Sequence, residues 1–144
     1  MLEETDKRIR VIVGHYGSGK TEFSVNYAIR LAERGNRTAL VDLDIANPYF
    51  RSREKQEILE RSGVAVYSNT FGYDISVDLP AISARIRAPL EDASCQTVVD
   101  AGGDDSGARV LIQFEKYLTE TDSDIFCVIN ANRPETAGVD GALR

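Results

Sequence analysis

The sequence predicts an α/β domain in which helices cover both faces of a mainly parallel sheet of about five strands. Short apolar segments alternate along the chain with longer segments of helical spacing. The apolar segments are nearly continuous hydrophobic runs, which is typical of parallel strands covered on both faces. We expect residues 1–144 to form a single three-layer domain that is incomplete at its C-terminus, because this length is short for a large sheet.

The order of the elements follows from hydrophobicity and from turn residues. The apolar runs predict strands at residues 9–13, 38–42, 64–67, 97–100 and 125–129. Helices are expected at residues 20–34, 52–62, 80–87 and 108–118. Gly35 and Gly63 end the first two helices, and Pro89 is expected to close the third. The last helix carries an apolar stripe made of Val110, Leu111, Phe114 and Leu118.

Composition excludes several classes of function. The net charge is −6 and no run of Lys or Arg occurs, so direct binding to nucleic acid is not expected. The charged N-terminus and the lack of a long apolar run predict a cytoplasmic protein without a transmembrane segment. Cys95 and Cys127 stand far apart and are expected to be small, partly buried hydrophobic residues. His15 is the sole histidine, which excludes a metal centre built on two imidazoles.

The segment between the first strand and the first helix, Gly14 to Thr21 (GHYGSGKT), fits the phosphate-binding pattern G-x-x-x-x-G-K-[ST] at every fixed position. A polyphosphate needs several backbone N–H groups directed at it, and glycine lets the chain turn tightly enough to supply them. The expected ligands of the phosphates are Gly14, Gly17, Ser18, Gly19, Lys20 and Thr21. Lys20 would hold the β- and γ-phosphates as a catalytic charge, and the Thr21 hydroxyl would bind Mg²⁺. The sequence therefore predicts a site for ATP, or another nucleoside triphosphate, with Mg²⁺.

Acidic residues at the ends of other strands complete this prediction. Asp100 ends a hydrophobic strand expected beside the loop strand, a position that suits a magnesium ligand. Asp42 and Asp44 flank Leu43 and point the same way, so one of them is expected to face the metal or the attacking water. We assign Thr21, Asp42 and Asp100 to the metal. Each acid also has a plainer interpretation as a solvated residue at a turn.

Further polar residues follow the same strands. Asp104 and Asp105 are expected to be exposed to solvent. Arg51 and Arg53 could bind phosphate in a bidentate way, although a surface position is at least as compatible with their polar helix.

Three stretches together resemble the MinD/ParA/ArsA-type ATPases, the branch of P-loop NTPases that includes the nitrogenase iron protein. These stretches are Gly14 to Thr21, VDLD at residues 41–44 and VVDAGG at residues 98–103. The likeness covers residues 9 to about 140, and residues 132–135 resemble the family's segment after its next strand. The resemblance implies that Asp44 positions the attacking water and that Asp100 and Gly103 belong to a switch region.

The loop departs from the family's usual K-G-G-x-G-K-[ST], because His15 and Tyr16 stand in its first two places. The resemblance therefore implies no lysine that reaches a partner's nucleotide in trans. The family's adenine-binding strand and loop would follow the last residue of this chain. A sheet edge left uncovered there would favour a homodimer.

Three functions remain open from the residues. The first is an ATPase whose nucleotide state switches a surface for a protein partner, formed by the loops at residues 42–53 and 100–107. The second is a small-molecule kinase in which an acid after the second strand activates an acceptor hydroxyl. The third is a module that binds nucleotide without turnover.

Overall fold

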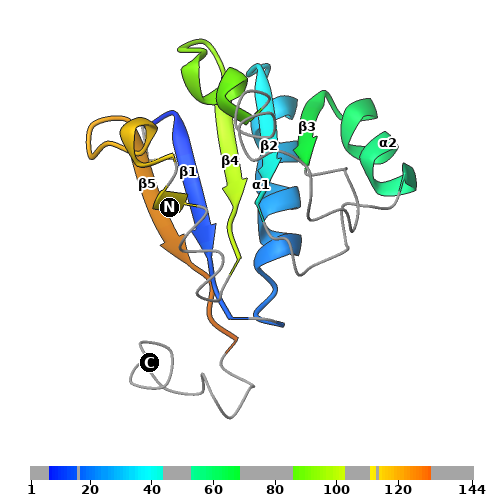
Figure 1. Cartoon of the computed structure of the whole chain (residues 1–144). Coiled ribbons are helices and arrows are strands. Elements are labelled where there is room, and N and C mark those ends of the chain that lie inside the picture. Colours follow the sequence, from blue (N-terminus) through cyan, green and yellow to red (C-terminus); the bar gives the residue numbers. More distant parts are fainter. Residues whose placement is uncertain are drawn as a thin grey trace, which may run out of the picture.

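The computed structural model describes residues 7–15, 17–43, 53–68, 86–102, 111–112 and 114–130. Within them, five parallel strands form one sheet in the order β3-β2-β4-β1-β5 (Figure 1). The strands are β1 (Ile9–Val13), β2 (Thr38–Asp42), β3 (Val64–Ser68), β4 (Gln96–Asp100) and β5 (Ser123–Cys127). The predicted α/β class and parallel sheet are confirmed, and each strand begins and ends within two residues of its expected bounds.

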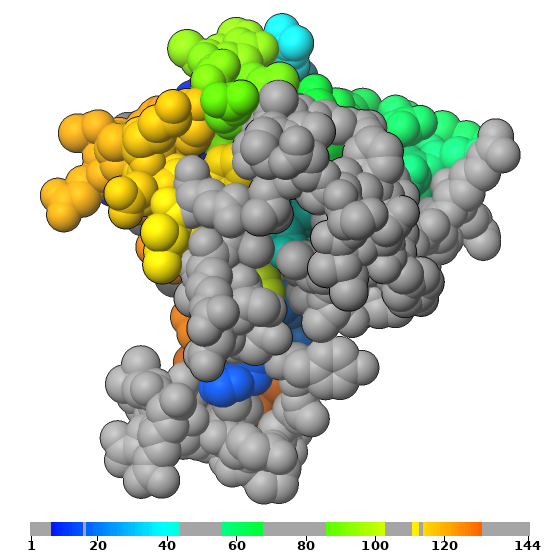
Figure 2. All heavy atoms as spheres, in the orientation of Figure 1, coloured from blue at the N-terminus to red at the C-terminus, as the bar shows by residue number. Residues whose placement is uncertain are grey.

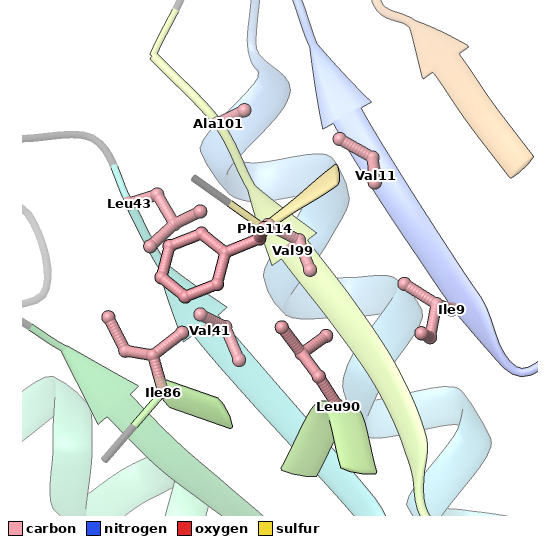
Figure 3. Close-up of a cluster of buried hydrophobic side chains, with 9 residues drawn as sticks. All are labelled: Ile9, Val11, Val41, Leu43, Ile86, Leu90, Val99, Ala101 and Phe114. Atoms are coloured by element: carbon pink, nitrogen blue, oxygen red, sulfur yellow. The ribbon is translucent and has the colours of Figure 1, made fainter. Parts of the chain in front are cut away.

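One face of the sheet carries a core in which Phe114 is central. Successive side chains of a strand point to opposite faces, so Ile9 and Val11 of β1 lie on this side with Val41 and Val99. The Phe114 ring lies over the sheet among these side chains (Figure 3). The buried members of the cluster are Ile9, Val11, Val41, Leu43, Ile86, Leu90, Val99, Ala101 and Phe114.

The opposite face is covered by α1 (Lys20–Glu33) and α2 (Arg53–Arg61). Buried residues of α1 recur at helical spacing, at Ser24, Tyr27, Ala28 and Leu31. Leu59 of α2 joins the same cluster and is 1% exposed. The helix α2 packs beside β3 at one end of the sheet (Figure 1). Helical segments therefore cover both faces, as the continuous hydrophobicity of the strands predicts.

A buried cation lies beneath α1. Arg10 of β1 is 4% exposed, and its guanidinium lies 5.5 Å from the centre of the Tyr27 ring. It also donates hydrogen bonds to the side chain of Gln96 and to the Arg8 carbonyl. The arginine thus joins β1, β4 and α1 by polar contacts inside a largely apolar layer.

The prediction that Pro89 closes the third helix is wrong, because residues 86–91 are helical. Ile86 and Leu90 are 2% and 3% exposed and hold this helix on the sheet. Its last carbonyls lack partners within the helix, and the Arg8 guanidinium supplies them by donating to Pro89 O at 3.1 Å and Leu90 O at 2.7 Å. These tertiary contacts outweigh the preference of proline for a helix end. The expected start at Pro80 lies outside the described residues.

The helix expected at residues 108–118 is only partly correct. Residues 111–112 are helical, Phe114 lies in a turn, and Glu115–Tyr117 forms a 3-10 helix. The expected apolar stripe still faces the sheet, because Leu111 and Leu118 pack against the cluster around Phe114. A regular helix is therefore not needed to bury this stripe; Val110 lies outside the described residues.

The strand β5 is an edge strand of the described sheet, beside β1, and one of its faces is exposed. Ile125 is 67% exposed, and Cys127 on the same face is also exposed. The expectation of a partly buried cysteine is confirmed for Cys95, which is 4% exposed, and is wrong for Cys127. The reason is that Cys127 belongs to this outermost strand. Figure 2 shows β5 on the flank opposite to α2.

No helix in the described part of the chain has the length and hydrophobicity that a bilayer crossing requires.

Candidate functional site

The glycine-containing loop connects β1 directly to α1, as the sequence predicts. The carboxyl ends of the parallel strands lie at one edge of the sheet, and the chain passes from β1 into this loop at that edge (Figure 1). Gly17 and Gly19 have φ angles of 76° and 89°, which side chains other than glycine rarely adopt. The Ser18 N–H donates to the His15 carbonyl at 3.0 Å and closes a turn inside the loop. The pattern's inner glycines thus shape the backbone; Tyr16 lies outside the described residues.

Gly14 is required for a different reason, which is close packing. A Cβ added there would lie 2.6 Å from Ser18 Oγ and 2.7 Å from the Val128 carbonyl oxygen. The carbonyl belongs to the segment after β5, whose Val128 N–H donates to Val13 O at 2.8 Å. Ser18 Oγ is buried here and has no hydrogen-bond partner among the described residues. Gly14 is therefore required for the space that a Cβ would fill.

The helix α1 begins directly after the loop. Its N-cap is Gly19, which has no side chain with which to cap the helix. The first N–H groups of a helix have no partner within it and carry the positive end of its dipole. An anion at this position would meet backbone donors, as in known phosphate sites.

Lys20 and Thr21, in the first turn of α1, both contact Asp100 at the end of β4. Lys20 Nζ lies 3.1 Å from Asp100 Oδ1, and the Thr21 hydroxyl donates to Oδ2 at 3.1 Å. The three side chains are buried, with Asp100 0% exposed. The register places Asp100 opposite Ile12 of β1, which confirms that the acid ends a strand beside the loop strand.

Asp42 is the neighbour of Asp100 across the sheet. The two residues stand opposite each other in the parallel pairing of β2 with β4. They share the face of Leu40 and Val98, which is the face covered by α1. Asp42 is 6% exposed, so two buried acids stand side by side at the carboxyl edge of the sheet. The structure thus brings together the residues predicted to hold the metal: Thr21, Asp42 and Asp100.

The chemistry of these groups suits a hard divalent cation. Mg²⁺ prefers carboxylate and hydroxyl oxygens and keeps several waters or phosphate oxygens as further ligands. Two carboxylates and a hydroxyl are oxygen donors of this kind. Across the ranges that the structure describes, no three His, Cys, Asp or Glu side chains are close enough to hold a metal. A cation here would therefore need ligands beyond these side chains, and phosphate oxygens are suitable ones.

Other predicted residues are not placed. Asp44, assigned to catalysis, lies outside the described residues, and so do Arg51, Gly103, Asp104, Asp105 and residues 132–135. Arg53 opens α2, but its side chain is not described. Their assignments remain predictions.

A shifted pKa occurs at the other end of β4, away from the loop. The Ser94 hydroxyl and then the Ser94 N–H donate to Asp92 and lower the pKa of this carboxyl. Arg37, whose Nη1 lies 3.0 Å from Asp92 Oδ2, lowers the pKa further. This acid stabilises the turn before β4 and is separate from the candidate site.

Comparison of the chain with models of known protein families finds no match, and no curated protein matches it. The functional conclusions therefore depend on the residues and on their geometry.

Proposed function

We propose that this chain is a P-loop nucleotide-binding protein that binds ATP, or another nucleoside triphosphate, together with Mg²⁺ and hydrolyses it. The observation that carries the proposal is the meeting of Lys20 and Thr21 with the buried Asp100 directly after the glycine loop. A glycine-rich turn that only started a helix would not need a lysine and a threonine buried against a strand-end acid.

Each part of the site has a role in this proposal. Backbone N–H groups of residues 14–21 would hold the phosphate oxygens, and Lys20 would place a charge on the β- and γ-phosphates. Thr21, Asp42 and Asp100 would hold the metal, directly or through water. When bound, Mg²⁺ neutralises charge on the phosphate oxygens and orients them.

Catalysis would consist of positioning and charge stabilisation, because phosphoryl transfer requires little covalent chemistry from the protein. Asp44 would orient the attacking water from the loop after β2. This role extends the resemblance to the MinD/ParA/ArsA-type ATPases. Asp42 and Asp100 stand opposite each other at the ends of β2 and β4, so a change of nucleotide beside them could alter a surface for a protein partner or a second copy of the chain.

The test is phosphate release from ATP with Mg²⁺, first alone and then with added acceptor hydroxyl compounds. Release without an acceptor supports the ATPase. A requirement for an acceptor would instead make the protein a kinase, and tight binding without product would make it a binding module. Failure of the folded protein to bind any nucleoside triphosphate would contradict the proposal as a whole.

A pair of lysine variants controls this experiment. Lys20→Ala should abolish binding or turnover, because the charge on the phosphates is lost. Lys7→Ala removes a lysine that pairs with Asp124 at 3.0 Å on the surface, and it should leave both unchanged.

A further inference from the structure

The edge of the sheet at β5 is apolar and exposed. Among the described strands, β5 has a neighbour on one side only, which is β1 (Figure 1). Ile125 and Ile129 are 67% and 46% exposed, and Cys127 between them is exposed as well. The sequence from residue 125 to residue 129 contains no charge and no proline. Edge strands usually carry such residues, because an apolar edge can pair with a strand of another chain.

The backbone of β5 directs hydrogen-bonding groups to this edge at the same exposed residues. The Ile9 N–H donates to Asp122 O at 3.0 Å at the start of the strand, and the Val128 N–H donates to Val13 O at 2.8 Å at its end. Backbone groups of successive residues in a strand point to alternate sides, so the even-numbered residues from 122 to 128 face β1. The N–H and C=O groups of Ile125 and Cys127 therefore point away from β1.

The hydrophobic pattern of this edge reads the same in both directions. Residues 125–129 are Ile-Phe-Cys-Val-Ile, with Cys127 at the centre. Antiparallel pairing about a twofold axis at Cys127 would place Ile125 opposite Ile129 of the second copy and the two Cys127 residues opposite each other. Side chains that stand opposite each other lie on the same face of a sheet, so the exposed isoleucines of the two copies would contact each other.

We propose that a second copy of this chain binds at β5 by antiparallel strand pairing about Cys127, which joins two sheets into one. A twofold contact uses the same surface on both copies, and this symmetrical strand supplies such a surface. Asp124, next to the apolar segment, already pairs with Lys7 at 3.0 Å, which reduces repulsion between two acidic copies. About five paired residues bury less area than a standard interface, so the dimer dissociates at micromolar concentrations.

Sedimentation velocity of the wild-type chain without nucleotide tests the proposal, over concentrations that bracket the micromolar range. Wild type should change from monomer to dimer as the concentration rises. Ile125→Lys should weaken the association by roughly tenfold or more, because its charge would be buried against an isoleucine of the second copy. The matched control is Ile58→Lys, since Ile58 is 51% exposed on α2 at the other end of the sheet, and it should dimerise like wild type.

The thiol of Cys127 tests the register of the pairing. In a Cys95→Ala variant it is the only thiol of the chain. Opposed residues of a hydrogen-bonded antiparallel pair have Cα atoms about 5.5 Å apart, a distance that a disulfide spans. Diamide should therefore link two copies: each thiol loses one proton and one electron, an S–S bond forms, and diamide is reduced to its hydrazine by both protons and both electrons. The linked dimer should form more slowly when Ile125→Lys is added.

Several results would overturn the proposal. These are a wild type that stays monomeric at the highest concentration, a dimer that Ile125→Lys does not weaken, and assembly beyond the dimer. A Cys127 that resists thiol reagents in the native monomer would also contradict it, because another part of the chain would then cover this edge. Circular dichroism establishes that each variant is folded, and if Ile125→Lys does not fold, the diamide link through Cys127 decides.

Discussion

Replacing Gly14 with alanine tests whether close packing at the end of β1 shapes the phosphate loop. The new Cβ would lie 2.7 Å from the Val128 carbonyl oxygen and 2.6 Å from Ser18 Oγ. The serine hydroxyl can rotate away, but the carbonyl belongs to a backbone segment tied to Val13 by a hydrogen bond of 2.8 Å. The strand ends must therefore move apart, and overpacking of this kind costs about 1–3 kcal/mol. The same movement displaces the loop.

We expect Gly14→Ala to lower the melting temperature by roughly 3–10 °C, which is the overpacking cost divided by the entropy of unfolding of a domain of this size. ATP affinity in the presence of Mg²⁺ should fall by about tenfold or more, because displaced amides bind phosphate poorly. The control is Gly35→Ala, at a φ of 86° with no heavy atom within 4 Å of the added Cβ. It should cost about 1 kcal/mol of stability through the backbone alone and leave affinity unchanged. Wild-type stability and affinity in Gly14→Ala would refute the packing argument.

Three further predictions concern other parts of the chain. Arg8→Ala should lower the free energy of unfolding by about 2–3 kcal/mol in urea titrations, since charged hydrogen bonds to Leu90 O and the Asp122 carboxylate are lost; a cost below that of Lys7→Ala would contradict this role. Ser94→Ala should raise the pKa of Asp92, followed by NMR titration of the carboxyl carbon. Because folding lowers the pKa of Asp92, the stabilising contribution of this carboxylate is present above the unfolded pKa and is lost as the pH falls through the folded pKa. The Ser94→Ala variant should lose part of that contribution. An unchanged pKa in the variant would exclude Ser94 as the cause of the lowered pKa. Asp44→Ala should retain ATP binding and lose turnover in a phosphate-release assay, whereas unchanged turnover would remove its assigned role.

The strands could be predicted well because burial on both faces of the sheet leaves a direct mark on the local sequence. A strand buried on both faces needs nearly continuous apolar residues, and residues 9–13 and 38–42 show this directly. Arg10 within the first of these strands is an exception that no pattern explains. Its burial depends on Tyr27 and Gln96, which are distant in the sequence.

The helix ends were harder to predict because tertiary contacts determine them. The guanidinium of Arg8 donates hydrogen bonds to the last carbonyls of a helix more than eighty positions away, which allows that helix to continue through Pro89. A sequence window around Pro89 contains no sign of this arginine. The exposure of Cys127 could not be predicted for a related reason, since it depends on which strand stands at the edge of the sheet.

The candidate site was partly predictable. The loop pattern and the strand-end acids identify the participants, and the parallel sheet explains why they meet at one edge. The pairing of Asp42 with Asp100 could not be derived, because it requires β4 to lie between β2 and β1 in the sheet. The contact of Lys20 with Asp100 follows from that same strand order.

Calorimetric titration of the wild-type protein with a non-hydrolysable ATP analogue and Mg²⁺ tests the central proposal most directly. We expect saturable binding at one site per chain, and loss of that binding in Lys20→Ala. A folded wild-type protein that takes up neither this analogue nor ADP would show that the loop after β1 is not a nucleotide site.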